Sequence, residues 1–153
     1  MRSRLPLLMH RIINNIEFNF LLFGFMANFV WEMLQMPFFT FSDKLSLSEI
    51  NFACLQASIG DAFILVIMFW TLSGLLKLRL WIFRLTSYRI GLFLLIGIII
   101  TIIFEHLATG PLDRWVYGDL MPVLPLLGTG ILPIIQWLIV PLFVLWLVRR
   151  QLK

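Results

Sequence analysis

Residues 90–108 read IGLFLLIGIIITIIFEHLA, a continuous apolar run with one carboxylate, Glu105. A helix needs roughly 20 apolar residues to cross about 30 Å of hydrocarbon. Three other runs have this character, at about 18–39, 55–76 and 129–148. Because these runs lack the alternation of transmembrane β-strands, they predict four membrane-spanning helices.

The composition favours the same conclusion. The chain is 61% hydrophobic and 13% charged, with a mean hydropathy of +0.97, whereas a soluble domain is about 45–50% apolar and about 25% charged. We therefore predict an all-α integral membrane protein, a four-transmembrane-helix bundle forming one domain over residues 1–153. Its single cysteine, Cys54, excludes an internal disulfide and any paired-cysteine motif.

The basic side chains are distributed unevenly. One side of the predicted membrane receives ten of the twelve: Arg2, Arg4, Arg11, Lys77, Arg79, Arg84, Arg89, Arg149, Arg150 and Lys153. The other side receives Lys44 and Arg114. By the positive-inside rule, both termini are predicted to be cytoplasmic. We expect the amino-terminal segment to be retained with the first span as a signal anchor, because it lacks a small-residue cleavage site.

The predicted outer loop, residues 109–128, is partly apolar. Its LMPVLPLLG stretch at 120–128 contains two prolines, and we expect it to lie along the outer interface or dip into it. Trp115 and Tyr117 are typical of interfacial anchors. The alternative is a lid over polar groups beneath, with Arg114 pairing one of their carboxylates.

Polar side chains interrupt all four predicted spans at a similar depth. A rise of 1.5 Å per residue places Glu32 and Gln136 roughly 10 Å, Asp61 roughly 9 Å and Glu105 roughly 5 Å below the outer edge. A charged side chain that faces lipid costs about 2.5–3.5 kcal/mol. We therefore expect these groups to face one another, a cavity or a bound cation.

Helical spacing indicates that these groups point inward. The stripes are Gly24, Asn28, Glu32 and Gln35; Ser58 and Asp61; Gly97, Thr101 and Glu105; and Pro133, Gln136 and Val140. Residues at such spacings share one helix face. Small residues on these faces allow neighbouring helices to approach closely.

The candidate site follows from this placement. The predicted ligand-binding residues are Asn28, Glu32, Gln35, Asp61, Glu105, His106, Arg114, Trp115, Tyr117 and Gln136. The candidate catalytic residues are Glu32, Asp61 and Glu105, and His106 joins these three as a candidate metal ligand, since histidine and carboxylates suit Zn, Fe or Mn. Successive helical residues point about 100° apart, so the alternative for His106 is an interfacial position. The sequence does not identify a cofactor. Glu17 is expected to pair with Arg11 or Arg89.

Several motifs together resemble a family of small bacterial inner-membrane proteins of unknown activity. The pattern is WExxQxP at 31–37, GD at 60–61, Glu105, WxY at 115–117, MP at 121–122 and PxxQWxxxP at 133–141. The residues that carry it are Glu32, Gln35, Pro37, Asp61, Glu105, Trp115, Tyr117, Met121, Pro122, Pro133, Gln136 and Pro141. The resemblance implies a bacterial source and the cell inner membrane, but no chemistry.

Three functions remain open. The first is binding or moving a cation, a proton or a small ligand at the buried carboxylate and amide site, because intramembrane ionisable residues are generally functional. The second is an intramembrane acid–base enzyme acting on a lipid, an isoprenoid or a quinone, with Glu32 and Glu105 as the acid–base pair. The third is a structural or assembly subunit of a membrane complex. We expect the lipid bilayer as a partner, leave open a homo-oligomer or a membrane-complex partner, and expect no nucleic acid. GxSxG, P-loop and GxGxxG motifs are absent from the sequence.

Overall fold

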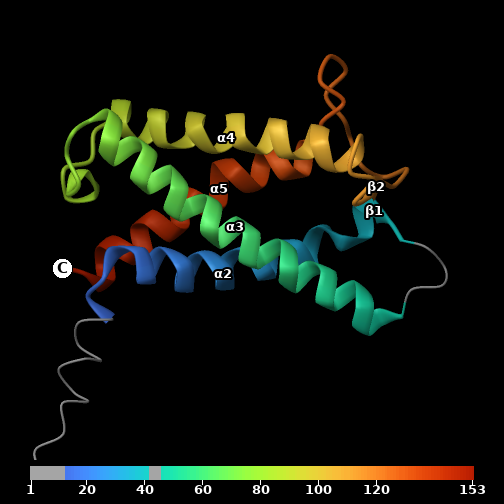
Figure 1. Ribbon diagram of the computed structural model, residues 1–153, viewed down its shortest axis with the longest axis horizontal. Coiled ribbons are helices and arrows are strands. Elements are labelled where there is room, and N and C mark those ends of the chain that lie inside the picture. The colour runs from blue at the N-terminus through green and yellow to red at the C-terminus, as the bar shows by residue number, and fades with distance from the viewer. Residues whose placement is uncertain (1–12, 42–45) are drawn as a thin grey trace, which may run out of the picture.

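The structure, a computed structural model, describes residues 13–41 and 46–153. Over these residues the chain forms the α-helices α2 (Ile16–Gln35), α3 (Leu47–Leu75), α4 (Ser87–Thr109) and α5 (Ile131–Gln151). They run along one elongated bundle (Figure 1), so the predicted all-α fold is confirmed. The amino-terminal segment with Arg2, Arg4 and Arg11, for which retention was predicted, lies outside the described residues, as does Lys44.

Side-chain caps begin α2, α3 and α4. Asn15 caps α2 and Thr86 caps α4 through their side-chain oxygens. At α3 the Ser46 hydroxyl accepts the Glu49 N–H over 3.4 Å, and the Glu49 carboxylate accepts the Ser46 N–H over 2.8 Å. This capping box satisfies backbone donors that have no partner within the helix.

The helix bounds differ from the predicted spans at two places. The helix α3 begins at Leu47, eight residues before the predicted span at 55–76, because the capping box starts it ahead of the apolar run. The helix α2 ends at Gln35, not at Phe39, since Pro37 does not continue an α-helix. Met36–Phe38 instead form the 3-10 turn η1. The bounds of α4 and α5 agree with the predicted spans within three residues.

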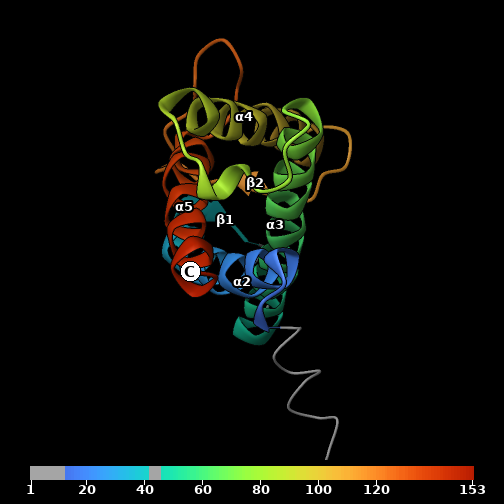
Figure 2. The ribbon, with the colours of Figure 1, turned by 90° about the vertical axis from the view of Figure 1, so that its left-hand side faces the viewer.

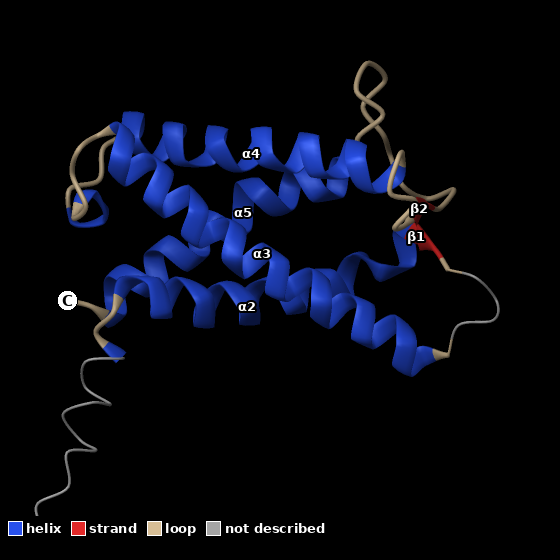
Figure 3. Ribbon diagram, viewed as in Figure 1, coloured by secondary structure: helices blue, strands red, loops and turns tan. Residues whose placement is uncertain are grey.

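A small antiparallel sheet closes one end of the bundle. It consists of β1 (Phe39–Thr40) and β2 (Val116–Tyr117), which join the segment after α2 to the loop after α4 (Figure 3). The Gly118 N–H also donates to the Phe38 carbonyl over 2.8 Å. The sequence did not predict this sheet. We call this end of the bundle the sheet end.

The opposite end, which we call the loop end, contains the α3–α4 connection with its 3-10 turn η2 (Trp81–Phe83). The first described residues and the carboxyl terminus lie there too (Figure 1). The loop end carries Lys77, Arg79, Arg84, Arg89, Arg149, Arg150 and Lys153, whereas Arg114 is at the sheet end. The predicted segregation of basic residues is therefore present in the described part of the chain.

The helices surround a common axis, with α2 and α4 each packed against α3 and α5 (Figure 2). At Gly24 the α2–α3 approach is so close that an added Cβ would lie 2.7 Å from Leu65 Cδ1 and 3.5 Å from Ala62 Cα. The predicted stripes of α2 and α4 do face the interior. Their buried members are Gly24, Asn28 and Gln35 in α2, and Gly97, Thr101 and Glu105 in α4.

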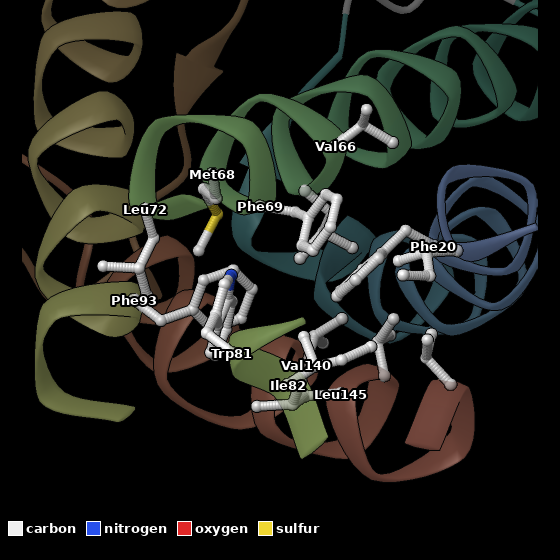
Figure 4. Packing of buried hydrophobic residues seen from close by; sticks show 14 of the residues in the cluster. Phe20, Val66, Met68, Phe69, Leu72, Trp81, Ile82, Phe93, Val140 and Leu145 are labelled. Atoms are coloured by element: carbon white, nitrogen blue, oxygen red, sulfur yellow. The ribbon is translucent and has the colours of Figure 1, made fainter. Parts of the chain in front are cut away.

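An apolar core fills the loop-end half of the bundle (Figure 4). The Phe20 ring stacks on Phe69 with centroids 5.3 Å apart, and Trp81 contacts Phe93 at the same distance. All four side chains are fully buried. Trp81 comes from η2, and its indole N–H donates to Ser73 Oγ over 3.2 Å. The α3–α4 connection thus closes the loop end with an aromatic side chain.

Glu17 lies near the loop end, at the start of α2. Its Oε1 accepts from an Arg79 guanidinium nitrogen over 2.6 Å and from Trp70 Nε1 over 3.0 Å. Arg79, not the expected Arg89, is therefore its partner, because the α3–α4 connection brings Arg79 back over the bundle. The other expected partner, Arg11, lies outside the described residues.

By length and composition, α3, α4 and α5 could each cross a membrane, and α2 does not meet the same measure among the described helices. The chain therefore has the character of a multi-pass, all-α membrane protein.

Candidate functional site

A cavity of about 470 Å³ lies at the sheet end and is lined by residues of all four helices. It contains seven of the ten predicted ligand-binding residues: Glu32, Gln35, Asp61, Glu105, Arg114, Trp115 and Gln136. Asn28 and Tyr117 are hydrogen-bonded to members of this group. The structure thus brings together the polar residues that the sequence placed at one depth. We call Glu32, Asp61 and Glu105 the carboxylate cluster.

Gln136 joins three helices at the cavity wall. Its Nε2 donates from α5 to Asn28 Oδ1 in α2 and to Asp61 Oδ2 in α3, each over 2.9 Å. Asn28 is held in turn, because its own Nδ2 donates to the Gly24 carbonyl over 2.9 Å. Both Gln136 donor hydrogens are used in these contacts. The amide therefore holds Asp61 in place but offers no further donor to a ligand.

Glu32 is held by a second glutamine within α2. Gln35 Nε2 donates to Glu32 Oε1 over 2.8 Å, and Trp31 Nε1 donates to Gln35 Oε1 over 3.0 Å. Glu32 is half-buried, whereas Gln35 is buried. Glu32, Asp61 and Glu105 all line the same cavity. The three carboxylates are therefore close enough to act on one ligand.

Glu105 takes its partners from the loop that the sheet holds in place. Tyr117 donates its hydroxyl to Glu105 Oε2, and Trp115 Nε1 lies 3.4 Å from the same oxygen. The β1–β2 pairing positions both aromatic residues, since Tyr117 lies opposite Phe39 in the register. Burial raises the pKa of Tyr117, and the hydrogen bond to Glu105 raises it further. The phenol is thus a stable donor to this carboxylate.

His106 and Arg114 do not join the carboxylate cluster. His106 is exposed, because it points about 100° around α4 from the buried Glu105. Arg114 lines the cavity but is exposed, and it forms no ion pair with any residue that the structure describes. Within residues 13–41 and 46–153, no three His, Cys, Asp or Glu side chains are placed to hold a metal ion. The candidate metal set of Glu32, Asp61, Glu105 and His106 is therefore not assembled.

An apolar wall from α3 completes the cavity. It comprises Ala53, Cys54, Ala57, Gly60, Phe63, Ile64 and Ile67. The sequence did not predict this wall, because an apolar helix face has the same pattern whether it faces lipid or a cavity. The sequence does contain one signal for this wall. Cys54, Ala57 and Ile64 lie three or four residues apart on the same helix face as Asp61, which is a predicted ligand-binding residue.

Residues 120–128 leave the bundle. Val123 forms an antiparallel bridge with Gly130, and the Ile131 N–H donates to the Pro122 carbonyl over 2.8 Å. The chain therefore turns back on itself and projects from the sheet end (Figure 1). Leu126 at the tip is 98% exposed. Its place at a membrane interface stays a prediction.

Comparison with known proteins finds no matching family model, no matching curated protein and no matching solved structure.

Proposed function

We propose that this chain is a small inner-membrane binding protein whose carboxylate cluster binds a cation or a small ligand with a positively charged, hydrogen-donating group. Three acidic side chains from three helices line one cavity, and Gln136 of the fourth helix donates to one of them, Asp61; this observation carries the proposal. An ionised carboxylate accepts hydrogen bonds and donates none. The donors nearest to them, from Gln35, Gln136 and Tyr117, are already used, so the cavity favours a ligand that brings donors and positive charge.

The proposal includes the orientation of the bundle. All four helices cross the membrane, α2 among them, because α2 lies alongside α3 and α5 over its length (Figure 2). The loop end faces the cytoplasm with both termini, since basic residues favour that side. The carboxylate cluster then lies in the outer part of a bacterial inner membrane and faces the periplasm. The resemblance to small bacterial inner-membrane proteins supports this source.

The shape of the interior favours binding over conduction. Between the cavity and the loop end the interior is filled by Leu65, Met68, Phe69, Trp81 and Phe93, all fully buried. A conducting path would need polar groups or water through this region. The cavity is therefore a pocket that ends at this apolar core, and release occurs on the side of entry.

An intramembrane acid–base enzyme is the second candidate, and the different partners of the carboxylates favour it. Glu105 accepts from a phenol and an indole, whereas Glu32 accepts from the amide of Gln35. Two carboxyl groups in unlike surroundings are the usual basis of acid and base roles. Glu32 would then face Glu105 across the bound substrate.

Infrared difference spectroscopy in lipid nanodiscs tests the proposal, with ethylammonium as the probe. We expect ethylammonium to change the carboxyl bands of the wild-type protein, and Glu32→Gln to abolish most of that change. Asp119→Asn is the matched control, because Asp119 is an exposed carboxylate outside the cavity. A spectrum unchanged by ethylammonium would contradict the proposal. If Glu32→Gln unfolds the bundle while Asp119→Asn does not, the carboxylate cluster serves helix packing, and this outcome favours the structural or assembly subunit.

A further inference from the structure

The cavity has a polar part and an apolar part. Its lining from α3 runs from Ala53 to Ile67 with Asp61 between them, and Phe63, Ile64 and Ile67 form the apolar part on the loop-end side of Asp61. Ile67 comes six positions after Asp61, which corresponds to about 9 Å along the helix. The apolar surface therefore extends from the carboxylates toward the loop end, parallel to α3. A ligand that fills both the polar and the apolar part must combine a polar head with an apolar chain.

The apolar wall also faces the outside of the bundle. Phe63, Ile67 and Phe104 line the cavity yet remain 55%, 47% and 56% exposed. The helices α3 and α4 meet at the loop end and diverge toward the sheet end (Figure 1). Gly60 lies in this wall, and a Cβ added there would meet no atom within 4 Å. The cavity is thus open sideways, between α3 and α4, at the level where the bundle would be surrounded by acyl chains.

The sheet end is more obstructed. Phe39 and Trp115 line the cavity there, and the Phe39 ring lies 5.7 Å from the ring of Tyr117. The β1–β2 pairing holds Phe39 opposite Tyr117, and Tyr117 and Trp115 both contact the Glu105 carboxylate. A ligand that arrives directly from water must pass them, whereas a ligand dissolved in the bilayer meets the open side between α3 and α4.

We propose that the ligand is a cationic amphiphile, with an ammonium head and a hydrocarbon chain, that enters from the bilayer between α3 and α4. Its head lies at the carboxylate cluster, and its chain lies along Phe63 and Ile67 toward the loop end. This assignment rests on the proposed function, since it requires the carboxylates to bind a positive charge. The occupant follows from charge complementarity: three carboxylates face a cavity whose lining includes a single basic side chain, the exposed Arg114. The volume of about 470 Å³ is within the range of about 300–1,000 Å³ for small-ligand pockets.

The carboxyl infrared signal tests the assignment with three probes in nanodiscs. Dodecylammonium has the charge and the chain, ethylammonium has only the charge, and dodecanol has only the chain. We expect half-saturation by dodecylammonium at a total concentration at least about tenfold lower than by ethylammonium, since even single methylene contacts change binding about tenfold. Dodecanol should leave the carboxyl bands unchanged. Equal half-saturation by the two amines would overturn the assignment but leave the proposed function standing. If neither amine changes the bands, both fail.

A pair of glycine variants tests the sideways entry. Gly60→Leu places a side chain in the open wall, and Gly91→Leu is its matched control, because Gly91 is also exposed, helical and free of neighbours but lies outside the cavity. We expect Gly60→Leu to weaken dodecylammonium binding at least about tenfold, with ethylammonium little affected, and Gly91→Leu to change neither. An undiminished response of Gly60→Leu to dodecylammonium would overturn the proposed entry. An equal loss for both amines would overturn it as well, since the side chain would then act on the head site alone.

Discussion

Gln136 and Asp61 stand 75 residues apart in the sequence, yet Gln136 Nε2 donates to Asp61 Oδ2 over 2.9 Å. The same nitrogen donates to Asn28 over 2.9 Å, so one side chain of α5 ties α2 and α3 together inside the bundle. Polar contacts of this kind are costly to break on one side only, because the abandoned partner stays buried.

Gln136→Leu should therefore destabilise the bundle. The substitution keeps the apolar bulk but removes the donor to Asp61 and Asn28, and we expect a loss of about 1 kcal/mol in the free energy of unfolding. Detergent-induced unfolding in mixed micelles measures it. Gln151→Leu is the control, since Gln151 is an exposed glutamine at the end of α5. Equal effects of the two substitutions would mean that the interhelical amide contributes nothing specific.

Gly24→Leu should be more damaging. A Cβ at this position would lie 2.7 Å from Leu65 Cδ1, and Leu65 is fully buried and cannot move aside freely. Overpacking of this kind costs about 1–3 kcal/mol. Gly91→Leu should be neutral or slightly stabilising, because that position is open and leucine favours a helix over glycine. A Gly24→Leu protein as stable as Gly91→Leu would contradict the close α2–α3 contact.

The Glu17–Arg79 contact predicts a pH dependence at the loop end. Burial raises the pKa of Glu17, but the hydrogen bonds from Trp70, from the backbone and from Arg79 outweigh it, so the pKa lies below the ordinary 4.5. A lowered pKa in the folded state adds stability that is present above the ordinary pKa and is lost as the pH falls through the lowered one. Glu17→Gln should therefore cost about 0.5 kcal/mol at pH 7.

Thermal unfolding of wild type and Glu17→Gln at a series of pH values measures this effect. The two curves should differ at neutral pH and converge when the pH falls well below 4.5. A difference that persists unchanged in acid would show that the glutamine disturbs packing rather than the ion pair.

Tyr117 should remain a neutral phenol above its ordinary pKa of 10.0, because burial and the hydrogen bond to Glu105 both raise its pKa. The chain has two tyrosines, so a Tyr88→Phe background isolates its tyrosinate absorption. Adding Glu105→Gln should lower the pKa of Tyr117 toward its ordinary value, since the substitution removes the carboxylate charge. Half-ionisation at or below pH 10 in the background protein would contradict the Tyr117–Glu105 contact.

The sequence predicted the helices well, and it predicted their ends less well. Apolar runs and helical stripes located the four helices and the inward faces of Gly24, Asn28 and Glu105. The early start of α3 was also readable, because SLSE at 46–49 has the S-x-x-E form of a capping box. The β1–β2 sheet was not readable, since each strand has two residues and its stability comes from pairing across two loops.

For the site, depth along each helix was sufficient to group Glu32, Asp61, Glu105 and Gln136, because a membrane helix has a nearly fixed rise. Depth along a helix does not predict the contacts that loop residues make. The sheet places Trp115 and Tyr117 on Glu105, and the α3–α4 connection returns Arg79 to Glu17. Neither the β1–β2 sheet nor the α3–α4 connection has a periodic pattern in the sequence.

Cross-linking between introduced cysteines tests the convergence of the carboxylate cluster most directly. In a Cys54→Ala background, a short bifunctional thiol reagent would be applied to the pairs Asp61→Cys with Gln136→Cys and Glu32→Cys with Glu105→Cys. Asp61→Cys with His106→Cys is the control, because His106 lies on the exposed side of α4. Our account predicts rapid intramolecular cross-links in the first two pairs and little in the third. Cross-links as slow in the first two pairs as in the control would contradict a shared cavity.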